Sequence, residues 1–163
     1  MSGAASWSFA EDDAARIRAI LERLLDEAGA RTALIVDRTG QMLATAGETP
    51  SFDPVAFASL TAADFSANDQ LARMLGESEF GALFHQGERE SLYLADVARR
   101  VILVVLFDTR TTLGLVKLRV RPVVERLGDL FAEIFGRRER PGPRVEAGFL
   151  GDAEDEIDKL FGN

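Results

Sequence analysis

Residues 101–107 read Val-Ile-Leu-Val-Val-Leu-Phe, a run of seven consecutive apolar side chains that directly follows two arginines. A strand that is apolar on both faces is typical of the centre of a sheet that is covered on both sides. The run is far too short to cross a bilayer, which takes about 20 apolar residues. The sequence therefore predicts a sheet with this strand at its centre and helices on both faces.

Other strands are expected around this run, because short apolar or alternating segments are separated by turn residues. The segments are residues 32–36, 41–46, 80–85 and 91–97. Asp37-Arg38-Thr39-Gly40 is typical of a hairpin turn and joins the first two. The pair Arg99-Arg100 closes a second hairpin onto the central strand. The sheet is therefore expected to be largely antiparallel.

Helical spacing of apolar residues occurs in three segments, residues 9–28, 54–76 and 111–135. The second is expected to begin at Pro54 with Asp53 as its cap. Residues 115–120 also alternate as a strand would, but the helical spacing is longer and favours a helix. Pro122 inside that helix removes a hydrogen bond and predicts a kink. The predicted order is helix, two strands, helix, three strands, helix.

The second helix has an unusual distribution of side chains around its axis. Its core-facing residues are predicted to be Phe57, Leu60, Leu71, Met74 and Leu75. Its outer face is predicted to consist of small and uncharged polar residues with one arginine, namely Ser59, Ala62, Ala63, Ser66, Gln70 and Arg73. An ordinary exposed face carries more Glu, Lys and Arg. This face is therefore either a solvated surface with little charge or a contact surface, since charges are depleted in interface cores.

The composition excludes several kinds of chemistry. The 163 residues include no cysteine and one histidine, His85, which excludes disulfides, thiolate nucleophiles and multi-histidine metal sites. A net charge of −8 argues against binding to nucleic acid or to anionic membranes. No phosphate-binding loop or nucleophile elbow occurs. We expect no catalytic residue, cofactor or metal, and, without a signal peptide or membrane-spanning run, a cytoplasmic protein.

Two single residues each have a functional and a structural interpretation. His85 ends a short strand, where a histidine is usually an edge or surface residue rather than a catalytic one. Arg110 could serve as an arginine finger, but the alternative is that it holds the corner between a strand and a helix through hydrogen bonds. The structural interpretation is favoured for both.

The chain is expected to comprise a domain over residues 1–136, a linker over 137–150 and a tail over 151–163. The linker contains two prolines, and the tail carries five acidic residues and one basic residue. In the tail, Ile157, Leu160 and Phe161 form one apolar stripe on a helix too short to be stable alone. The tail is either a frayed terminus or a peptide that docks into a groove on a partner.

Several segments resemble bacterial roadblock proteins of the MglB type, which belong to the dynein light-chain superfamily. They are residues 57–62 (FASLTA), 92–93 with 100–104, 107–116 (FDTRTTLGLV) and 155–161 (DEIDKLF). The resemblance spans about residues 9–161. It implies the roadblock fold, an α/β protein of the α+β kind. Its five-stranded, mostly antiparallel sheet has one helix on one face and two on the other, in the order predicted above. It also favours a helix after residue 111.

The resemblance further implies a GTPase-activating protein for a small Ras-like GTPase of the MglA type, which controls cell polarity and motility. Proteins of this family act on the GTP-bound form and reposition the GTPase's own catalytic residues. The residues expected to bind the GTPase are Ser59, Ala63, Ser66, Ala67, Gln70 and Arg73. The tail residues Ile157, Leu160 and Phe161 are expected to dock on the GTPase. Enrichment at a cell pole is an alternative to a diffuse cytoplasmic distribution.

The same resemblance implies a homodimer in which the third strands of two copies pair. The expected interface residues are Phe80, Leu83, Phe84 and His85. This agrees with a general rule, since an apolar edge strand left open invites pairing. Two other functions remain as alternatives: a roadblock scaffold that binds a GTPase without accelerating hydrolysis, and a small enzyme or metabolite-binding domain, which no motif favours.

Overall fold

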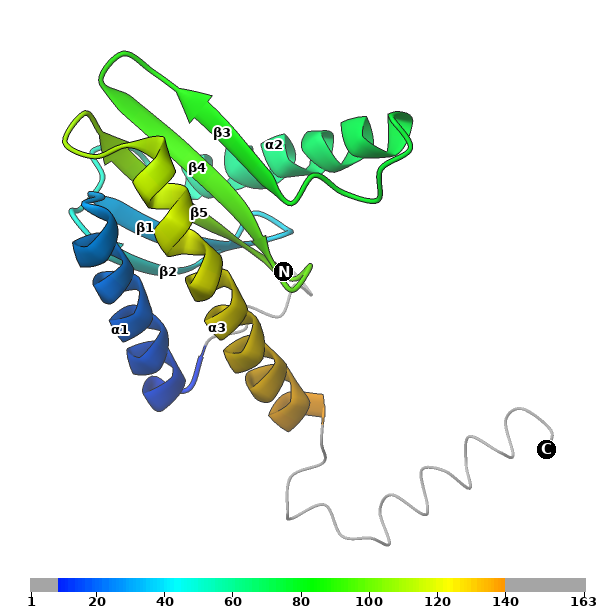
Figure 1. Cartoon of the computed structure of the whole chain (residues 1–163). Helices are drawn as coiled ribbons and strands as arrows, with labels where there is room; N and C mark the ends of the chain where they lie inside the picture. The colour runs from blue at the N-terminus through cyan, green and yellow to red at the C-terminus, as the bar shows by residue number, and fades with distance from the viewer. Residues whose placement is uncertain (1–8, 140–163) are drawn as a thin grey trace, which may run out of the picture. The chain divides into compact units, whose positions relative to one another are not determined.

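The computed structural model describes residues 9–139, which form three helices and five strands (Figure 1). Their bounds are α1 Glu11–Ala28, β1 Thr32–Asp37, β2 Met42–Gly47, α2 Pro54–Met74, β3 Ala82–Gln86, β4 Glu90–Val97, β5 Val101–Asp108 and α3 Leu113–Glu139. The predicted order of elements is confirmed. The chain divides into two compact units, Met1–Asp129 and Leu130–Asn163, and the first contains the whole sheet.

The five strands form one sheet in the order β2-β1-β5-β4-β3, and every neighbouring pair is antiparallel. The strand predicted to be central is central: β5 lies third of five, and all seven side chains from Val101 to Phe107 are buried. Figure 1 shows α1 and the part of α3 that belongs to the first unit, residues 113–129, on one face of the sheet and α2 on the other. This arrangement is the predicted roadblock fold.

The core beneath α2 is built from the alternate side chains of three strands. Phe65 of α2 is 1% exposed and is packed, with Ala58, among the large aliphatic residues of the sheet. These are Leu34 and Val36 of β1, Leu94 of β4, and Ile102, Val104 and Leu106 of β5. The same strands point their other side chains to the opposite face, where α1 contacts β1 and β2.

Local sequence explains where several elements begin and end. The helix α1 ends at Gly29, whose φ of 68° lies in the left-handed region that glycine adopts without strain. The helix α2 begins as predicted, because the Asp53 carboxylate accepts a 3.0 Å hydrogen bond from the Val55 N–H and Pro54 follows the cap. A bulge interrupts the pairing of β1 with β2 between Ile35 and Val36. The helix α3 continues through Pro122.

The predicted inward face of α2 is wrong. Leu60, Met74 and Leu75 are 70%, 82% and 74% exposed, and Leu71 is also exposed. The residues that face the sheet are Ala58, Thr61, Ala62, Phe65, Asn68 and Ala72. Ala62, predicted to face outward, is therefore buried. Small side chains let the helix axis approach the sheet closely, and Phe65 is the one large side chain of α2 that is fully buried.

One residue of the predicted inward face does contact the core. Phe57 is half-buried and stacks on Phe52 with ring centroids 4.4 Å apart. Both rings pack against the core beneath α2. The other residues of the predicted inward face lie further round the helix axis than Phe57, or after the last residue of α2 that packs on the core.

Other predicted bounds differ by a few residues. β3 begins at Ala82, so Phe80 lies in the connection before the strand. α3 extends to Glu139, past the predicted start of the linker. The remainder of that linker, and the tail with Ile157, Leu160 and Phe161, lie outside the described residues. In the described part of the chain, no helix has the length and apolar character needed to span a membrane.

Gly47→Ala should lower the free energy of unfolding by about 3 kcal/mol, because the position combines strain with a clash. Its φ is +90°, and an added Cβ would lie 2.3 Å from the Arg31 carbonyl oxygen. Gly76→Ala is the matched control, since its φ is +82° but no atom lies within 4 Å of the added Cβ. It should cost only about 1 kcal/mol. Equal losses for the two variants in urea unfolding would contradict the proposed clash.

Candidate functional site

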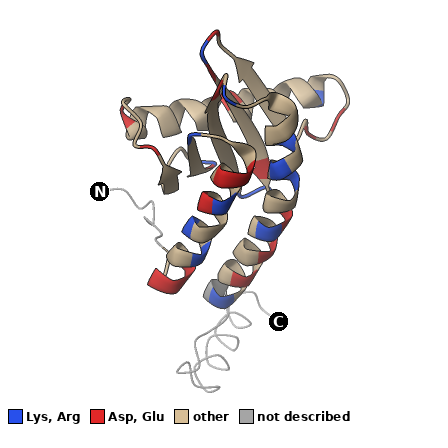
Figure 2. Ribbon diagram, turned by 60° about the vertical axis from the view of Figure 1, so that its left-hand side comes forward, with Lys and Arg blue, Asp and Glu red and all other residues tan. Residues whose placement is uncertain are grey.

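The outer side of α2 carries the residues predicted to bind a partner. All six are exposed: Ser59, Ala63, Ser66, Ala67, Gln70 and Arg73. We call them the small-residue face. Of the 21 residues of α2, only Asp64, Asp69 and Arg73 are charged. Figure 2 shows the contrast with α1 and α3, which are banded with charge.

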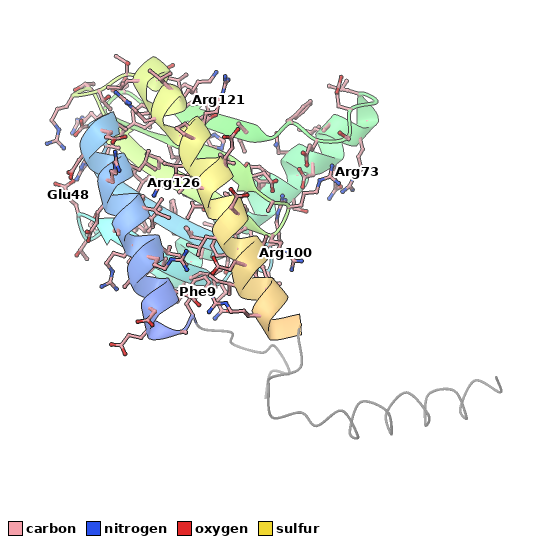
Figure 3. All side chains as sticks on the ribbon, turned by 60° about the horizontal axis from the view of Figure 1, so that its bottom comes forward. Phe9, Glu48, Arg73, Arg100, Arg121 and Arg126 are labelled. Atoms are coloured by element: carbon pink, nitrogen blue, oxygen red, sulfur yellow. The ribbon has the colours of Figure 1, made fainter. Side chains whose placement is uncertain are left out.

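A second exposed surface of α2 lies beside the first. Leu60, Leu71, Met74 and Leu75 form an apolar stripe in which the least exposed member, Leu71, is still 56% exposed. At 100° per residue, this stripe lies between the small-residue face and the buried face of the helix. Figures 1 and 3 show the C-terminal end of α2, marked by Arg73 in Figure 3, reaching past the strands. Exposed large apolar residues grouped in this way are typical of interaction surfaces.

The apolar stripe lies next to the open edge of the sheet. His85 of β3 contacts Asp64 of α2, with His85 Nε2 2.6 Å from Asp64 Oδ2, so this side of the helix faces β3. β3 is an edge strand, paired only with β4. Its Leu83 and Phe84 are half-buried, and Phe80 just before it is 40% exposed. The stripe and the β3 edge therefore form one continuous, partly apolar surface.

His85 lies in the edge strand β3, where the sequence places it, and contacts a carboxylate of α2. Both His85 and Asp64 are partly exposed, and their contact joins an edge strand to a helix. Among the described residues, no group of three or more His, Cys, Asp or Glu side chains is arranged to hold a metal ion. The residue thus belongs to the surface formed by α2 and β3.

Arg110 is held by its own neighbour. Its Nε lies 3.0 Å from both carboxylate oxygens of Asp108, and its Nη2 lies 2.9 Å from Asp108 Oδ2. The backbone N–H of Arg110 donates to the same carboxylate at 3.0 Å. This fixes the corner between β5 and α3. The pair also holds the pKa of the Asp108 carboxyl below its ordinary value, chiefly through the side-chain hydrogen bond.

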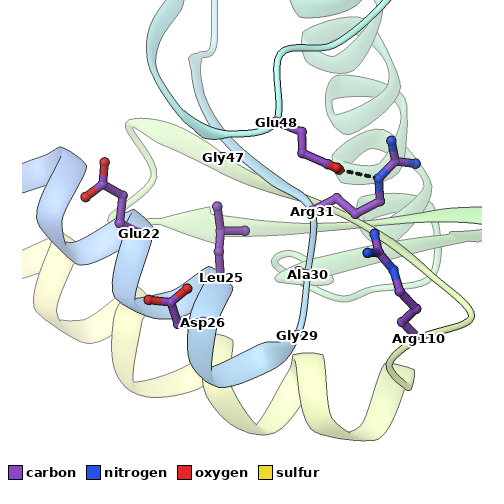
Figure 4. Close-up of a pocket in the computed structure, with 9 residues that line it drawn as sticks. All are labelled: Glu22, Leu25, Asp26, Gly29, Ala30, Arg31, Gly47, Glu48 and Arg110. Carbon is purple, nitrogen blue, oxygen red and sulfur yellow. Dashed lines mark hydrogen bonds and ion pairs between the residues drawn. The ribbon is translucent and has the colours of Figure 1, made fainter.

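A surface hollow of about 800 Å³ lies beside this corner, near the C-terminal end of α1 (Figure 4). Its cations are already paired. Arg31 Nε lies 2.5 Å from Glu48 Oε2, and Arg31 also pairs with Glu90 and Asp108. In the view of Figure 3, Glu48 and Arg73 lie far apart, at the left and at the right. None of the residues that line the hollow belongs to α2, so it is separate from the small-residue face, and both of its arginines are paired with carboxylates.

The sequence and the structure of this chain are both similar to those of known proteins. Residues 16–107 match the model of the Roadblock/LC7 domain. This chain belongs to the Roadblock/LC7 family. The structure of Myxococcus xanthus MglB is similar, with 42% identity, a TM-score of 0.70, and coverage of 72% of this chain and 96% of that one. The gliding protein MglB of Thermus thermophilus is 36% identical with a TM-score of 0.72, covering 78% of this chain and 97% of that one.

A further solved structure, described as MglB with a tetrameric arrangement, is 36% identical to this roadblock chain with a TM-score of 0.73. The alignment covers 79% of this chain and 97% of that one. No curated protein matches the chain at a significant level. This chain therefore aligns with almost the whole length of these MglB chains, and it is similar to them in sequence as well as in fold.

The apolar stripe is the part of this roadblock surface that helical periodicity misses. Periodicity assigns Leu60, Leu71, Met74 and Leu75 to the core because large apolar side chains are usually buried. The signal that could have found them is the shortage of charge. A helix with three charged residues in 21 has more apolar surface than it can bury by packing one face on the sheet. Such a helix has apolar side chains on an exposed side as well as on its buried one.

Arg110→Ala should raise the pKa of the Asp108 carboxyl toward its ordinary value, because the largest cause of the lowered pKa is removed. A lowered carboxyl pKa stabilises the fold above about pH 4, and this stabilisation is lost as the pH falls through the folded-state pKa. The variant should therefore lose less stability on acidification. Carboxyl ¹³C NMR titration measures the pKa directly.

Arg23→Ala is the control for this experiment. Arg23 Nε lies 2.8 Å from Glu27 Oε1, and the pKa of Glu27 is lowered chiefly by that hydrogen bond. The control should shift the pKa of Glu27 and leave that of Asp108 unchanged. An Asp108 pKa that does not move in Arg110→Ala would show that Arg110 is not held as described.

Proposed function

We propose that this roadblock protein is a GTPase-activating protein for a Ras-like GTPase of the MglA type, and thereby a regulator of cell polarity and motility. The observation that carries the proposal is the exposed, charge-poor outer side of α2 in a chain 36–42% identical to MglB proteins. A protein partner fits such a surface better than a small ligand, because it is convex and extends along the helix.

The small-residue face is the proposed platform for the GTPase. Ala63, Ser66 and Ala67 project little from the helix, so a partner backbone can approach it closely. Gln70 and Arg73 supply hydrogen-bond donors at one end of the face, where they can fix the register of the partner. A face of this kind has little charge to desolvate when a protein covers it.

The proposed mechanism uses the catalytic groups of the GTPase. Arg110, the residue considered as an arginine finger, is occupied by Asp108 and is not part of α2. Activation would then come from the platform stabilising a GTPase conformation in which its own Arg and Gln reach the γ-phosphate. Placing one such cation at the transition state is worth roughly 10³–10⁵ in rate. The GTP-bound form is the expected ligand, since it holds the γ-phosphate that those residues must meet.

The active form is proposed to be a homodimer built on the β3 edge and the apolar stripe. Pairing two β3 strands about a two-fold axis continues the sheet and satisfies the open hydrogen-bonding groups of both edges. The same operation brings together two copies of the stripe, which would bury Leu60, Leu71 and Met74. The small-residue faces of both copies would then lie on one outer surface. Phe80, Leu83, Phe84 and His85 remain the proposed strand contacts.

The tail is proposed to add a second contact with the GTPase through Ile157, Leu160 and Phe161. Its acidic composition suits a basic patch on the partner. A scaffold that binds the GTPase without changing its rate uses the same platform, so only a rate measurement separates the two functions.

The protein should accelerate multiple-turnover GTP hydrolysis by its cognate GTPase. Ser66→Arg combined with Gln70→Arg should weaken binding by roughly a hundredfold or more, because two large charges would be buried without partners. Phosphate release and isothermal titration with the GTP-loaded GTPase measure the two effects. Binding without acceleration by the unaltered protein would identify it as a scaffold.

A matched control is available on α1. Ala15 and Ala19 are exposed and also four residues apart, so Ala15→Arg with Ala19→Arg adds the same charge to another helix. This variant should bind and activate as the unaltered protein does. Equal losses for both double variants would mean that added charge, and not the platform, explains the effect.

Light scattering at micromolar concentration should give roughly 36 kDa, twice the chain mass of 17.8 kDa. Leu71→Glu should shift the mass toward the monomer, since the carboxylate would be buried in the stripe. Leu118→Glu is the control, because Leu118 is 64% exposed on α3 and away from α2. A mass near that of one chain for the unaltered protein, or equal dissociation of both variants, would refute this interface.

A further inference from the structure

One arginine joins three parts of the fold at the end of the platform. Arg38 lies in the turn between β1 and β2. Its Nη1 is 2.8 Å from Asp69 Oδ2 of α2, and its Nη2 pairs with Asp96 Oδ1 of β4. The side chains of Arg38, Asp69 and Asp96 are 28%, 18% and 10% exposed. We call these three residues the Arg38 junction.

The guanidinium of Arg38 contacts two successive turns of α2. Its Cζ lies 4.9 Å from the centroid of the Phe65 ring, which is the main core residue of the helix. Asp69 lies four residues further along, on the next turn. A planar cation that rests on one turn and pairs with the next constrains both the rotation and the tilt of the helix.

The turn that carries Arg38 is itself rigid. The Asp37 carboxylate accepts hydrogen bonds from the backbone N–H groups of Thr39 and Gln41, at 3.0 and 2.9 Å, and from the Thr39 hydroxyl at 2.7 Å. Gly40 in the same turn packs so closely on α2 that an added Cβ would lie 3.1 Å from Ser59 Cα. The turn therefore contacts α2 at Ser59 and again at Phe65 and Asp69.

The third arm of the junction leads to the β4–β5 hairpin. The other oxygen of Asp96 accepts the backbone N–H of Arg99 at 3.0 Å. Ala98 and Arg99 both have positive φ, 54° and 59°, so the carboxylate stabilises a tight turn that these residues adopt at some cost. Arg99 also pairs with Glu79, in the connection that leaves α2, at 3.4 Å.

We propose that Arg38 is a positioning residue that holds the C-terminal half of α2, and with it the platform, in the geometry that receives the GTPase. This inference rests on the proposed function. That half of the helix is held by few core contacts beyond Phe65, because Leu71, Met74 and Leu75 are exposed and only the small residues Asn68 and Ala72 are buried after Phe65. Gln70 follows Asp69 directly, and Arg73 lines the same hollow as Arg38 and Asp69.

Removal of the Arg38 guanidinium should weaken the Arg38 junction, because both of its partners are negatively charged. One guanidinium pairs with two largely buried carboxylates, so its removal leaves Asp69 and Asp96 without their shared cation. The helix can relieve this by moving Asp69 into solvent, which displaces Gln70 and Arg73. A lysine at this position has a single ammonium in place of the two-pronged guanidinium and cannot match both pairs.

The test uses the full chain and two measurements. In Arg38→Met, backbone amides of residues 69–75 should exchange with deuterium about tenfold faster, while those of β1 and β5 stay protected. The activator concentration for half-maximal GTP hydrolysis should rise about tenfold, because about a tenth of the molecules hold the competent geometry. The maximal rate at saturating activator should not change.

Variants of the α2 arm provide an independent test if Arg38→Met folds poorly. Asp69→Ala removes the pairing to α2 and leaves Arg38 paired with Asp96, so it should act as Arg38→Met does. Asp69→Asn keeps an oxygen that accepts from Arg38 and should restore most of the protection and the half-maximal concentration. Arg23→Met, which removes the exposed pair with Glu27 on α1, should match the unaltered protein.

The outcomes separate this inference from the proposed function. Unchanged exchange of residues 69–75 in both Arg38→Met and Asp69→Ala would overturn the role of the junction in holding α2. Faster exchange with an unchanged half-maximal concentration would overturn its role in positioning the platform. If the unaltered protein has no effect on the GTPase, the proposed function fails and the positioning role fails with it, while the exchange data still decide whether the junction holds the helix.

Discussion

Burial of β5 on both faces is the constraint from which the arrangement of the other elements follows. Seven apolar side chains in a row point alternately to the two sides of the sheet, so each side must be covered by a helical layer and each edge of β5 by another strand. β1 and β4 occupy those two edges. Within the first unit, α1 and residues 113–129 of α3 cover one face, and α2 covers the other (Figure 1). Over residues 9–139, the helix α2 has no neighbouring helix on its face of the sheet, whereas α1 and residues 113–129 of α3 share the other face.

That difference explains the composition of α2. Its buried side combines one large residue, Phe65, with five smaller ones, which allows the helix to lie close to the strands; the five are Ala58, Thr61, Ala62, Asn68 and Ala72. No second helix shields its flanks within the described residues, so its larger apolar side chains face outward. The helix is therefore apolar on a side that its own domain does not cover. A surface of that kind costs solubility in a lone monomer, and the proposed contacts with a second copy and with a GTPase would offset that cost.

The elements themselves could be predicted from the sequence because their signals are local. The apolar run of β5, the Asp53-Pro54 start of α2 and the glycine after α1 each depend on a few neighbouring residues. Which side of α2 meets the sheet could not be predicted in the same way, since periodicity identifies a face only when the other faces are polar. For this reason Leu60, predicted to face the core, is exposed, and Ala62, predicted to face outward, is buried. In the Arg38 junction, Asp69 lies 31 positions and Asp96 lies 58 positions along the chain from Arg38. No pattern along the chain pairs Arg38 with either of them.

The two edges of the sheet are not equivalent, and this limits what the molecule could assemble into. β3 offers a regular strand flanked by apolar side chains, whereas β2 pairs with β1 through a bulge between Ile35 and Val36 and ends at a glycine with positive φ. A bulged and twisted edge is a poor template for another strand. If both edges were equally receptive, copies could add head to tail without limit and form fibres. With one receptive edge for each chain, the proposed pairing of β3 strands would stop after a single symmetric event and would leave a closed particle.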